Sequence, residues 1–220
     1  MDTQGKIITK KPQVKETVGD QYYVRNNPQG TDFDISKYAE NITRTSTVKK
    51  IGVSETVEST AVRGSGKVYK TVTKTAYIDF AVENIAVVPE DLSWMKGETS
   101  DECGLVQAGE KDTRPFFAYG KVVEKTEEAK QYEWYPKCQL IENTDDIETS
   151  GENFAEQNDT LTIRAYPFDD EGHIKNYVNS EMSNFPTGLT EEMFFSSVIT
   201  SKEDLKAIIA SIETEEPAGV

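Results

Sequence analysis

Apolar residues recur at every second position over much of the segment 67–84 (KVYKTVTKTAYIDFAVEN). A period of two predicts a long β-strand with one buried face, because successive side chains of a strand point to opposite sides of a sheet. Strands usually span about five to six residues. We therefore expect either that a bend divides this strand or that it belongs to something larger than one subunit. The face predicted to be buried consists of Val68, Val72, Ala76, Ile78, Phe80 and Val82. The opposite face consists of Tyr69, Thr71, Thr73, Thr75, Asp79 and Glu83.

A second extended segment is predicted at residues 43–58. Its apolar residues of one parity are Ile51, Val53 and Val57. Val48 has the other parity, so we expect a β-bulge near Lys49 and Lys50. The intervening residues 59–66 (STAVRGSG) are small and include two glycines. This composition is typical of the tip of a long hairpin and equally of a disordered surface loop.

Two helices are predicted. In the segment 88–97, Pro89 suits a first helical turn and Gly97 suits the position after the last turn. Near the C-terminus, Ser201 followed by Asp204 resembles a capping box. The apolar residues that follow at helical spacing are Leu205, Ile208, Ile209 and Ile212.

The remaining strands are predicted at residues 21–25, 114–124, 131–141 and 159–168. Pro136 lacks a backbone N–H, which indicates an edge or a bulge in the third of these. The residues expected to share one face of that strand are Tyr132, Trp134, Cys138 and Leu140. Those expected to share a face of the last strand are Leu161, Ile163 and Ala165.

These elements predict a mainly β fold, a sandwich or a partly closed barrel with one short and one longer helix. Residues 1–20 are polar and read as an N-terminal arm. Residues 21–200 form the β domain, with the long hairpin at 43–84. Residues 201–220 form the C-terminal helix and a frayed tail.

Composition adds a strong acidic balance. The chain has 39 Asp and Glu against 24 Lys and Arg, a net charge of −15. This balance argues against a basic patch that grips phosphates. Apolar runs are too short for a membrane span of about 20 residues, and the N-terminal sequence lacks the apolar core of a secretory signal. We expect no membrane partner.

Candidate chemistry is sparse, because neither a nucleophile elbow nor a phosphate-binding glycine loop is present. Two cysteines and one histidine are too few for a Cys/His zinc site, so we expect no metal and no cofactor. Cys103 and Cys138 are expected to be reduced thiols, with a single disulfide as the less favoured alternative. His173 lies in a turn-forming sequence and is expected to be exposed.

Adjacent carboxylates keep an enzymatic alternative open. The pairs are Asp145 with Asp146, Asp169 with Asp170 and Glu191 with Glu192. A glycosidase uses two carboxylates, although an acidic chain contains such pairs by chance. A β-sandwich adhesin or carbohydrate-binding module is the other alternative. Both alternatives predict a monomer.

The order of elements resembles that of the major tail protein, or tail tube protein, of long non-contractile-tailed phages in the phi13-like group. The resemblance covers roughly residues 20–200. It rests on the long hairpin with a glycine-rich tip and the short helix after it. The sequence segments that carry it are AYIDFAVE at 76–83, RPFFAYG at 114–120, YEWYPKC at 132–138 and DTLTIRA at 159–165.

The resemblance implies a structural virion protein that closes into six-fold rings, which stack into a hollow tube. Residues 43–58 and 67–83 would line the channel. Residues of the lumen side would be Thr71, Thr73, Thr75, Asp79 and Glu83. Contacts between rings would come from the arm 1–20 and from Ser59, Thr60, Ala61, Val62, Arg63, Gly64, Ser65 and Gly66.

The resemblance also implies partners and a location. Besides other copies of itself, the chain would contact the tape-measure protein and the tail terminator and distal tail proteins. Assembly would occur in the host cytoplasm and the product would be part of the virion. DNA would pass through without specific binding, because a wall of Thr, Asp and Glu offers phosphates no basic contacts. No catalytic activity is expected.

Overall fold

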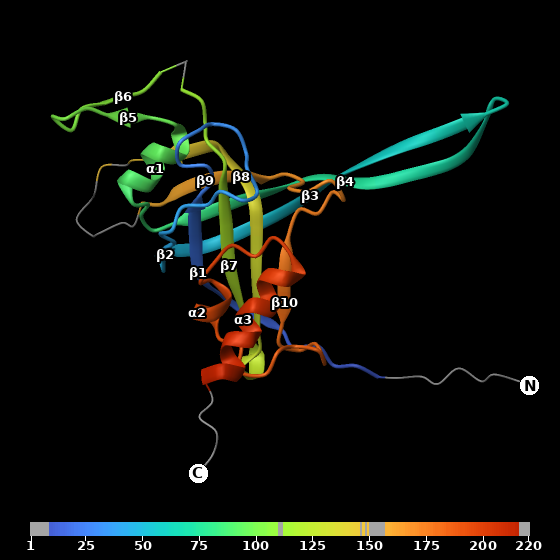
Figure 1. Cartoon of the computed structure of the whole chain (residues 1–220). Helices are drawn as coiled ribbons and strands as arrows, with labels where there is room; N and C mark the ends of the chain where they lie inside the picture. Colours follow the sequence, from blue (N-terminus) through green and yellow to red (C-terminus); the bar gives the residue numbers. More distant parts are fainter. Residues whose placement is uncertain (1–8, 110–111, 146, 148, 150–156, 216–220) are drawn as a thin grey trace, which may run out of the picture.

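The structure, a computed structural model, describes residues 9–109, 112–145, 147, 149 and 157–215 (Figure 1). Its strands are β1 (Lys15–Arg25), β2 (Thr43–Thr45), β3 (Val48–Gly64), β4 (Lys67–Asn84), β5 (Thr99–Ser100), β6 (Val106–Gln107), β7 (Phe117–Lys125), β8 (Lys130–Asp145), β9 (Asp159–Ala165) and β10 (Asn176–Asn179). Its helices are α1 (Pro89–Lys96), α2 (Glu191–Phe194) and α3 (Lys202–Glu215), with a 3₁₀ turn η1 (Thr126–Glu128) between β7 and β8.

Eight strands of the described part form one antiparallel sheet. Seven of them follow the order β2-β1-β7-β8-β9-β4-β3, and β10 also pairs with β8. A separate small ribbon consists of β5 and β6. The mainly β class predicted from the sequence is therefore confirmed.

The sheet bends sharply along β8, so that its two halves cross (Figure 1). The first half of β8 pairs with β7 and β10, and the second half pairs with β9. The bend lies at a bulge, because Tyr119 pairs with Tyr135 whereas Phe117 pairs with Cys138, across the segment that contains Pro136. Strands that turn such corners through bulges are typical of orthogonally packed sheets. The result is a single folded sheet that forms a partly closed barrel.

The main core fills the inside of this fold. Phe80 of β4 is fully buried and makes edge-to-face contacts with Tyr119 and Tyr135, at centroid distances of 5.4 and 4.6 Å. Helix α1 adds Met95, also fully buried, and ends at Gly97 in the left-handed conformation. The other members of this buried cluster are Tyr23, Ile78, Val82, Phe117, Cys138, Leu140, Leu161, Ile163, Ala165 and Ile174.

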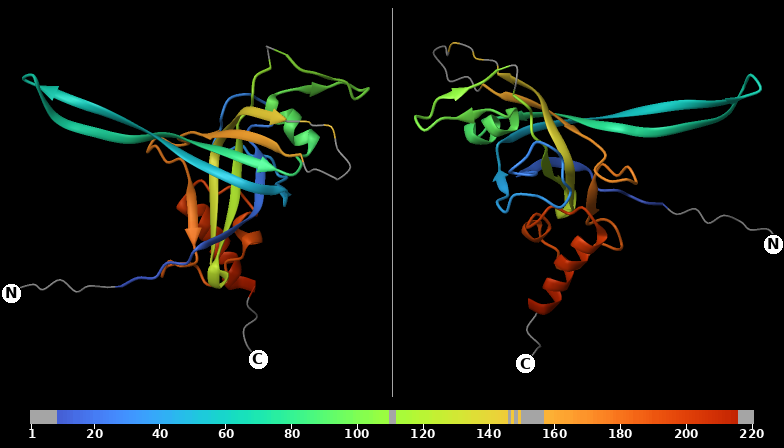
Figure 2. Two further views of the ribbon diagram at one scale, coloured as in Figure 1. Left: turned by 180° about the vertical axis from the view of Figure 1, so that it is seen from behind. Right: turned by 45° about the horizontal axis from the view of Figure 1, so that its top comes forward.

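A second core lies on the outer face of β1, β7 and β8, beneath the C-terminal segments (Figure 2). Tyr22 stacks on Phe195 at a centroid distance of 3.9 Å. Gly120 permits this approach, since a Cβ there would lie 2.7 Å from the Phe195 ring. Helix α3 packs on the same cluster through Leu205, Ile208 and Ile212. The C-terminal helix therefore covers part of the outer face of the sheet.

The predicted capping box is present at the start of α3. The Asp204 N–H donates to Ser201 Oγ at 3.3 Å, and the Ser201 N–H donates to Asp204 Oδ2 at 2.8 Å. Burial of Asp204 alone would raise its pKa, but the bonds from Thr200 and Ser201 hold the pKa below its ordinary value. Within the described residues, each helix is too short or too polar to cross a membrane.

One face prediction is wrong. Tyr132 and Trp134 contact the outer cluster, whereas Cys138 and Leu140 point into the main core. The bulge at Pro136 adds one residue to β8, and one added residue moves every later side chain to the other face. The four residues therefore do not share a face.

Other elements differ in extent. Strand β1 begins at Lys15, so the polar segment predicted as an arm to residue 20 contributes its last residues to the sheet. Residues 1–8 and 216–220 lie outside the described part. Strands β5 and β6 lie in a segment, residues 98–113, at which the sequence predicts no strand. Cys103 is exposed and Cys138 is buried, and both are free thiols as predicted.

A buried ion pair joins β7 to β8 inside the fold. Lys121 Nζ lies 3.1 Å from Glu133 Oε2, and the two side chains are 7% and 5% exposed. Glu133 also accepts hydrogen bonds from Tyr135 and Gln131. Burial alone would raise the pKa of Glu133, but the Lys121 charge and the Tyr135 hydroxyl hold the pKa below its ordinary value. Glu133 is thus a buried carboxylate that needs its cation.

We expect Lys121→Met to destabilise the fold by about 3–5 kcal/mol, because it leaves the Glu133 carboxylate buried without a counter-charge. Urea unfolding followed by tryptophan fluorescence measures the change. The double variant Lys121→Met/Glu133→Gln removes both charges and should recover most of the lost stability. Equal destabilisation in the single and double variants would contradict this assignment.

Candidate functional site

The most distinctive feature of the molecule is the hairpin of β3 and β4, which projects far from the body (Figures 1 and 2). Every residue from Val57 to Lys74 is exposed. We call this part, residues 57–75, the ribbon. Its side chains contribute to neither of the two buried clusters.

The ribbon has only its own two strands for support. Beyond β3, β4 pairs with β9, and that pairing covers Ile78–Asn84 alone. The outer edge of β3 pairs with no strand of the described part of the chain. An isolated two-stranded hairpin is at best marginally stable in water, and an open edge offers unpaired backbone groups to another chain. The ribbon therefore has the properties of an element that is completed on assembly.

The structure contains a hairpin at the segment for which the sequence left two interpretations. Ser65 and Gly66 form its turn with φ values of 51° and 77°, as in the type I′ turns that suit twisted hairpins. The predicted tip, Ser59–Gly66, is therefore too long. Residues 59–64 belong to β3 and pair with β4.

A bulge divides the long strand β4. Thr56 pairs with Tyr77 and Val57 pairs with Thr75, so Ala76 is an extra residue in β4. Side chains of directly opposite residues lie on the same face of an antiparallel pair. The parity of β4 is therefore reversed on the two sides of Ala76.

The reversal corrects the predicted lumen-side group. Thr71, Thr73 and Thr75 lie on the ribbon face that continues Ile78, Phe80 and Val82, because the β3 partners of all six residues are odd-numbered. A hydrogen bond of 2.9 Å between Thr73 Oγ1 and Ser59 Oγ agrees with this pairing. Asp79 and Glu83 lie on the opposite face. Whether any of the five faces a channel stays a prediction.

Val68 and Val72, predicted to be buried, are exposed by 53% and 45%. They lie beyond the bulge, where the ribbon has left the body. Tyr69, at a second irregularity in the pairing, is exposed by 85%. Exposed apolar residues on a projecting ribbon are typical of a surface that contacts another protein.

The two faces of the ribbon differ in chemistry. The first, which we call the neutral face, carries only uncharged side chains along most of its length, namely Val57, Ser59, Ala61, Thr71, Thr73 and Thr75, with Arg63 and Val68 close to the tip. The second, which we call the charged face, carries Glu58, Thr60, Val62, Lys67, Lys70, Val72 and Lys74. The segment 58–74 contains four basic residues and one acidic residue, in a chain of net charge −15. The ribbon is thus basic, whereas the chain as a whole is acidic.

Asp79 and Glu83 have partners within the chain. Arg164 donates two hydrogen bonds to Asp79, at 2.7 and 2.9 Å, and its guanidinium lies 3.9 Å from the centroid of the Tyr77 ring. The Asn158 amide donates to Glu83 at 2.9 Å. These two carboxylates therefore hold β4 to its neighbours.

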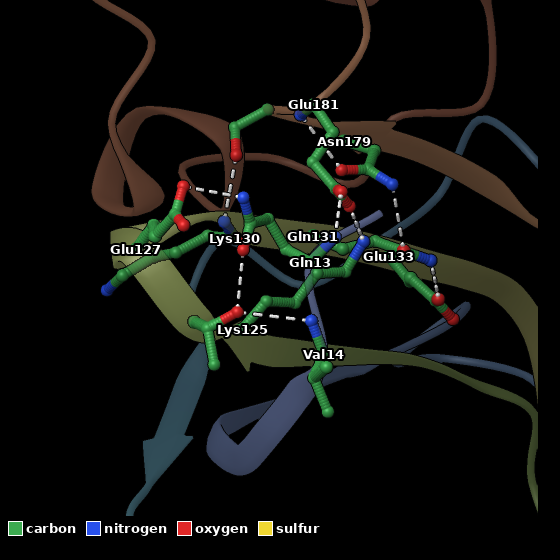
Figure 3. Close-up of polar contacts among 11 residues, drawn as sticks. Gln13, Val14, Lys125, Glu127, Lys130, Gln131, Glu133, Asn179 and Glu181 are labelled. Carbon is green, nitrogen blue, oxygen red and sulfur yellow. Dashed lines mark hydrogen bonds and ion pairs between the residues drawn. The ribbon is translucent and has the colours of Figure 1, made fainter. Parts of the chain in front are cut away.

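A network of polar contacts fixes the base of the N-terminal arm to the lower end of the sheet (Figure 3). The Gln13 N–H donates to Glu181 at 2.7 Å, and its side-chain amide donates to Glu127 at 2.6 Å. Thr126 bonds to Gln13 and Val14 from η1. The Lys125 ammonium pairs with Glu181. These contacts therefore fix Gln13 and Val14 to the end of β7, to η1 and to Glu181.

We expect this anchor to loosen in acid. The Lys125 ammonium and the Gln13 N–H hold the pKa of Glu181 below its ordinary value of 4.5. Because the pKa is depressed in the folded protein, the contact is fully present above pH 4.5 and is lost as pH falls through the folded pKa. NMR titration of the Gln13 amide should give a midpoint below 4.5, and Glu181→Gln should abolish the transition. A midpoint at or above 4.5 would exclude the bond.

In two of the carboxylate pairs on which the glycosidase alternative rests, one carboxylate has a structural partner. Asp169 bonds to His173, an exposed turn residue as predicted. Glu191 accepts a hydrogen bond of 2.7 Å from the Tyr22 hydroxyl and lies 3.5 Å from the Lys130 ammonium. Asp146 lies outside the described residues. Among those described, no three His, Cys, Asp or Glu side chains gather as metal ligands would.

Comparison with known proteins gives little further information. The sequence matches no protein-family profile and no curated protein. Among solved structures, the fold is similar to a chain of the anti-feeding prophage baseplate, a six-fold symmetrised cryo-EM structure. The similarity has a TM-score of 0.44 and 10% sequence identity, over 79% of this chain and 100% of that chain.

Proposed function

We propose that this chain is a structural protein of a phage tail, of the tail tube type, whose copies close into rings that stack into a tube. The ribbon is the observation that carries the proposal. It projects from a well-packed body, has an open edge, and adds no side chain to the two buried clusters of the described residues. A second copy that pairs with that edge would satisfy its backbone groups and would remove an edge prone to aggregation.

The neutral face of the ribbon suits a channel wall past which DNA slides. Thr71, Thr73 and Thr75 offer no cation to phosphate, so they add none of the affinity that counterion release provides. Asp79 and Glu83 lie on the other face and bond within the chain. Of the five predicted lumen-side residues, only the three threonines would therefore face the channel. In this proposal the protein is not an enzyme, and its partners are other copies and the tape-measure, terminator and distal tail proteins of the virion.

The test is the assembly state of the purified chain. Negative-stain electron microscopy should show rings or tubes. Sedimentation velocity over a range of protein concentration should show species larger than the monomer. The alternatives, an adhesin module or a glycosidase, predict a monomer at every concentration. A monomer that persists at high concentration would overturn the proposal.

A further inference from the structure

We propose that the charged face of the ribbon docks into a groove between α1 and the β5–β6 ribbon of a second copy of this chain. The inference rests on the proposed self-assembly and identifies the surface that receives the ribbon. It would make the contact heterologous, with a different surface on each partner. Repetition of such a contact produces a ring if the rotation closes and a filament if it does not.

The receiving groove has a volume of about 430 Å³. Its lining includes the carboxylates of Glu90 and Glu98, the ring of Trp94 and the side chain of Val106. Val106 is exposed by 42%, and the adjacent Leu105 by 57%. The groove thus combines an acidic rim with apolar surface that its own chain leaves uncovered.

The opposite charges of the two surfaces favour the ribbon as the occupant of the groove. Residues 88–109, which form α1 and the β5–β6 ribbon, contain five acidic residues and one basic residue. The charged face of the ribbon presents Lys70 and Lys74 beside Val62 and Val72. The lysines and valines of the ribbon would therefore face the carboxylates and apolar side chains of the groove. Such complementarity of charge is typical of specific interfaces.

A second groove, of about 340 Å³, lies between β1 and β3. It has apolar walls too, but its lining has one carboxylate, Glu16, against four lysines, Lys15, Lys49, Lys50 and Lys121. A basic ribbon would be repelled there. Of these two grooves, the one between α1 and the β5–β6 ribbon is therefore the better receiver.

The placement of the two surfaces fits a head-to-tail contact. The tip of the ribbon and the β5–β6 ribbon lie on opposite sides of the molecule in all views (Figures 1 and 2). A subunit can thus give its ribbon to one neighbour and receive the ribbon of another. The neutral face then stays free on the side away from the groove.

Charge reversal on the full chain tests the contact. Lys70→Glu/Lys74→Glu and Glu90→Lys/Glu98→Lys should each reduce assembly by at least tenfold, measured as the concentration needed for half the protein to associate. The combined variant, with the charges exchanged, should recover most of the loss. The control Lys202→Glu/Lys206→Glu changes the net charge equally on α3 and should assemble as the parent does.

Cysteine cross-linking gives a direct geometric readout. Cys103 is exposed in the turn between β5 and β6, whereas Cys138 is buried. A cysteine at Lys70→Cys, on the charged face, should form an intermolecular disulfide with Cys103 under mild oxidation. Thr71→Cys, on the neutral face, should cross-link several-fold less, and Cys103→Ser should remove the product.

The outcomes separate the two proposals. If the parent chain assembles but both reversals assemble normally, or if Lys70→Cys fails to link to Cys103, the docking site is wrong and self-assembly stands. A parent chain that stays monomeric at every concentration overturns both.

Discussion

Removal of the ribbon should abolish assembly and leave a folded monomer. In this variant residues 58–74 are replaced by Asn-Gly, which joins the paired residues Val57 and Thr75 by a two-residue type I′ turn. Because every deleted residue is exposed, we expect the free energy of unfolding to change by less than about 1 kcal/mol. Association should fall below detection at concentrations where the parent forms particles.

Two measurements decide this prediction: circular dichroism with thermal unfolding for the monomer, and sedimentation velocity for the assembly. A matched control, Ser65→Asn, keeps the ribbon and retains the positive φ of the turn, which Asn tolerates. It should assemble normally. If the shortened chain still forms particles, the ribbon is not the assembling element.

The substitution Phe80→Asp should prevent the chain from folding. Loss of a buried phenylalanine ring alone is worth about 3–5 kcal/mol, and the variant also places a carboxylate among Tyr119, Tyr135 and the aliphatic core. A buried charge without a partner adds a further large penalty. Since domains have about 5–15 kcal/mol of stability in total, we expect loss of soluble, cooperatively unfolding protein.

The matched control is Thr73→Asp, seven residues earlier on the same strand and on the same ribbon face. Thr73 is exposed, so the monomer should keep its melting temperature within a few degrees. Soluble expression and thermal unfolding of both variants test the pair. A folded Phe80→Asp protein, or an unfolded Thr73→Asp protein, would show that the body of the molecule begins elsewhere along β4.

The sequence predicts the longer elements of this fold well, because each has a strong local signal, but it predicts none of the short elements β5, β6, β10 and α2. The period of two in β4 and β9, the proline at the start and the glycine at the end of α1, and the capping box of α3 are all visible without a structure. The bulge expected near Lys49 is confirmed, since Val48 pairs with Asn84 and Lys50 pairs with Glu83.

The faces of the long strands are harder to predict. At Pro136 the missing N–H indicated an irregularity, yet the residues on its two sides were still placed on one face. At Ala76 the sequence gives no signal at all, because Thr75, Ala76 and Tyr77 all suit a regular strand. A single inserted residue moves every side chain beyond it to the other face of the strand. The bulge at Ala76 therefore places Thr71, Thr73 and Thr75 on the face opposite to the predicted one.

The candidate surfaces were only partly visible in the sequence. The sequence predicts the long hairpin, and the contrast between the basic residues 58–74 and the acidic chain can be read directly from the residues. The acidic groove has no comparable signal. It depends on how α1 and the β5–β6 ribbon lie together, and the segment that forms that ribbon reads as a polar loop.

Hydrogen exchange at the ribbon tests the central claim most directly. Peptides that cover residues 57–75 are measured by mass spectrometry in dispersed protein and in assembled particles at the same pH. If a second copy completes the ribbon, its amides exchange quickly in the monomer and at least tenfold more slowly in the particles. Particles whose ribbon exchanges as fast as that of the monomer would contradict the account.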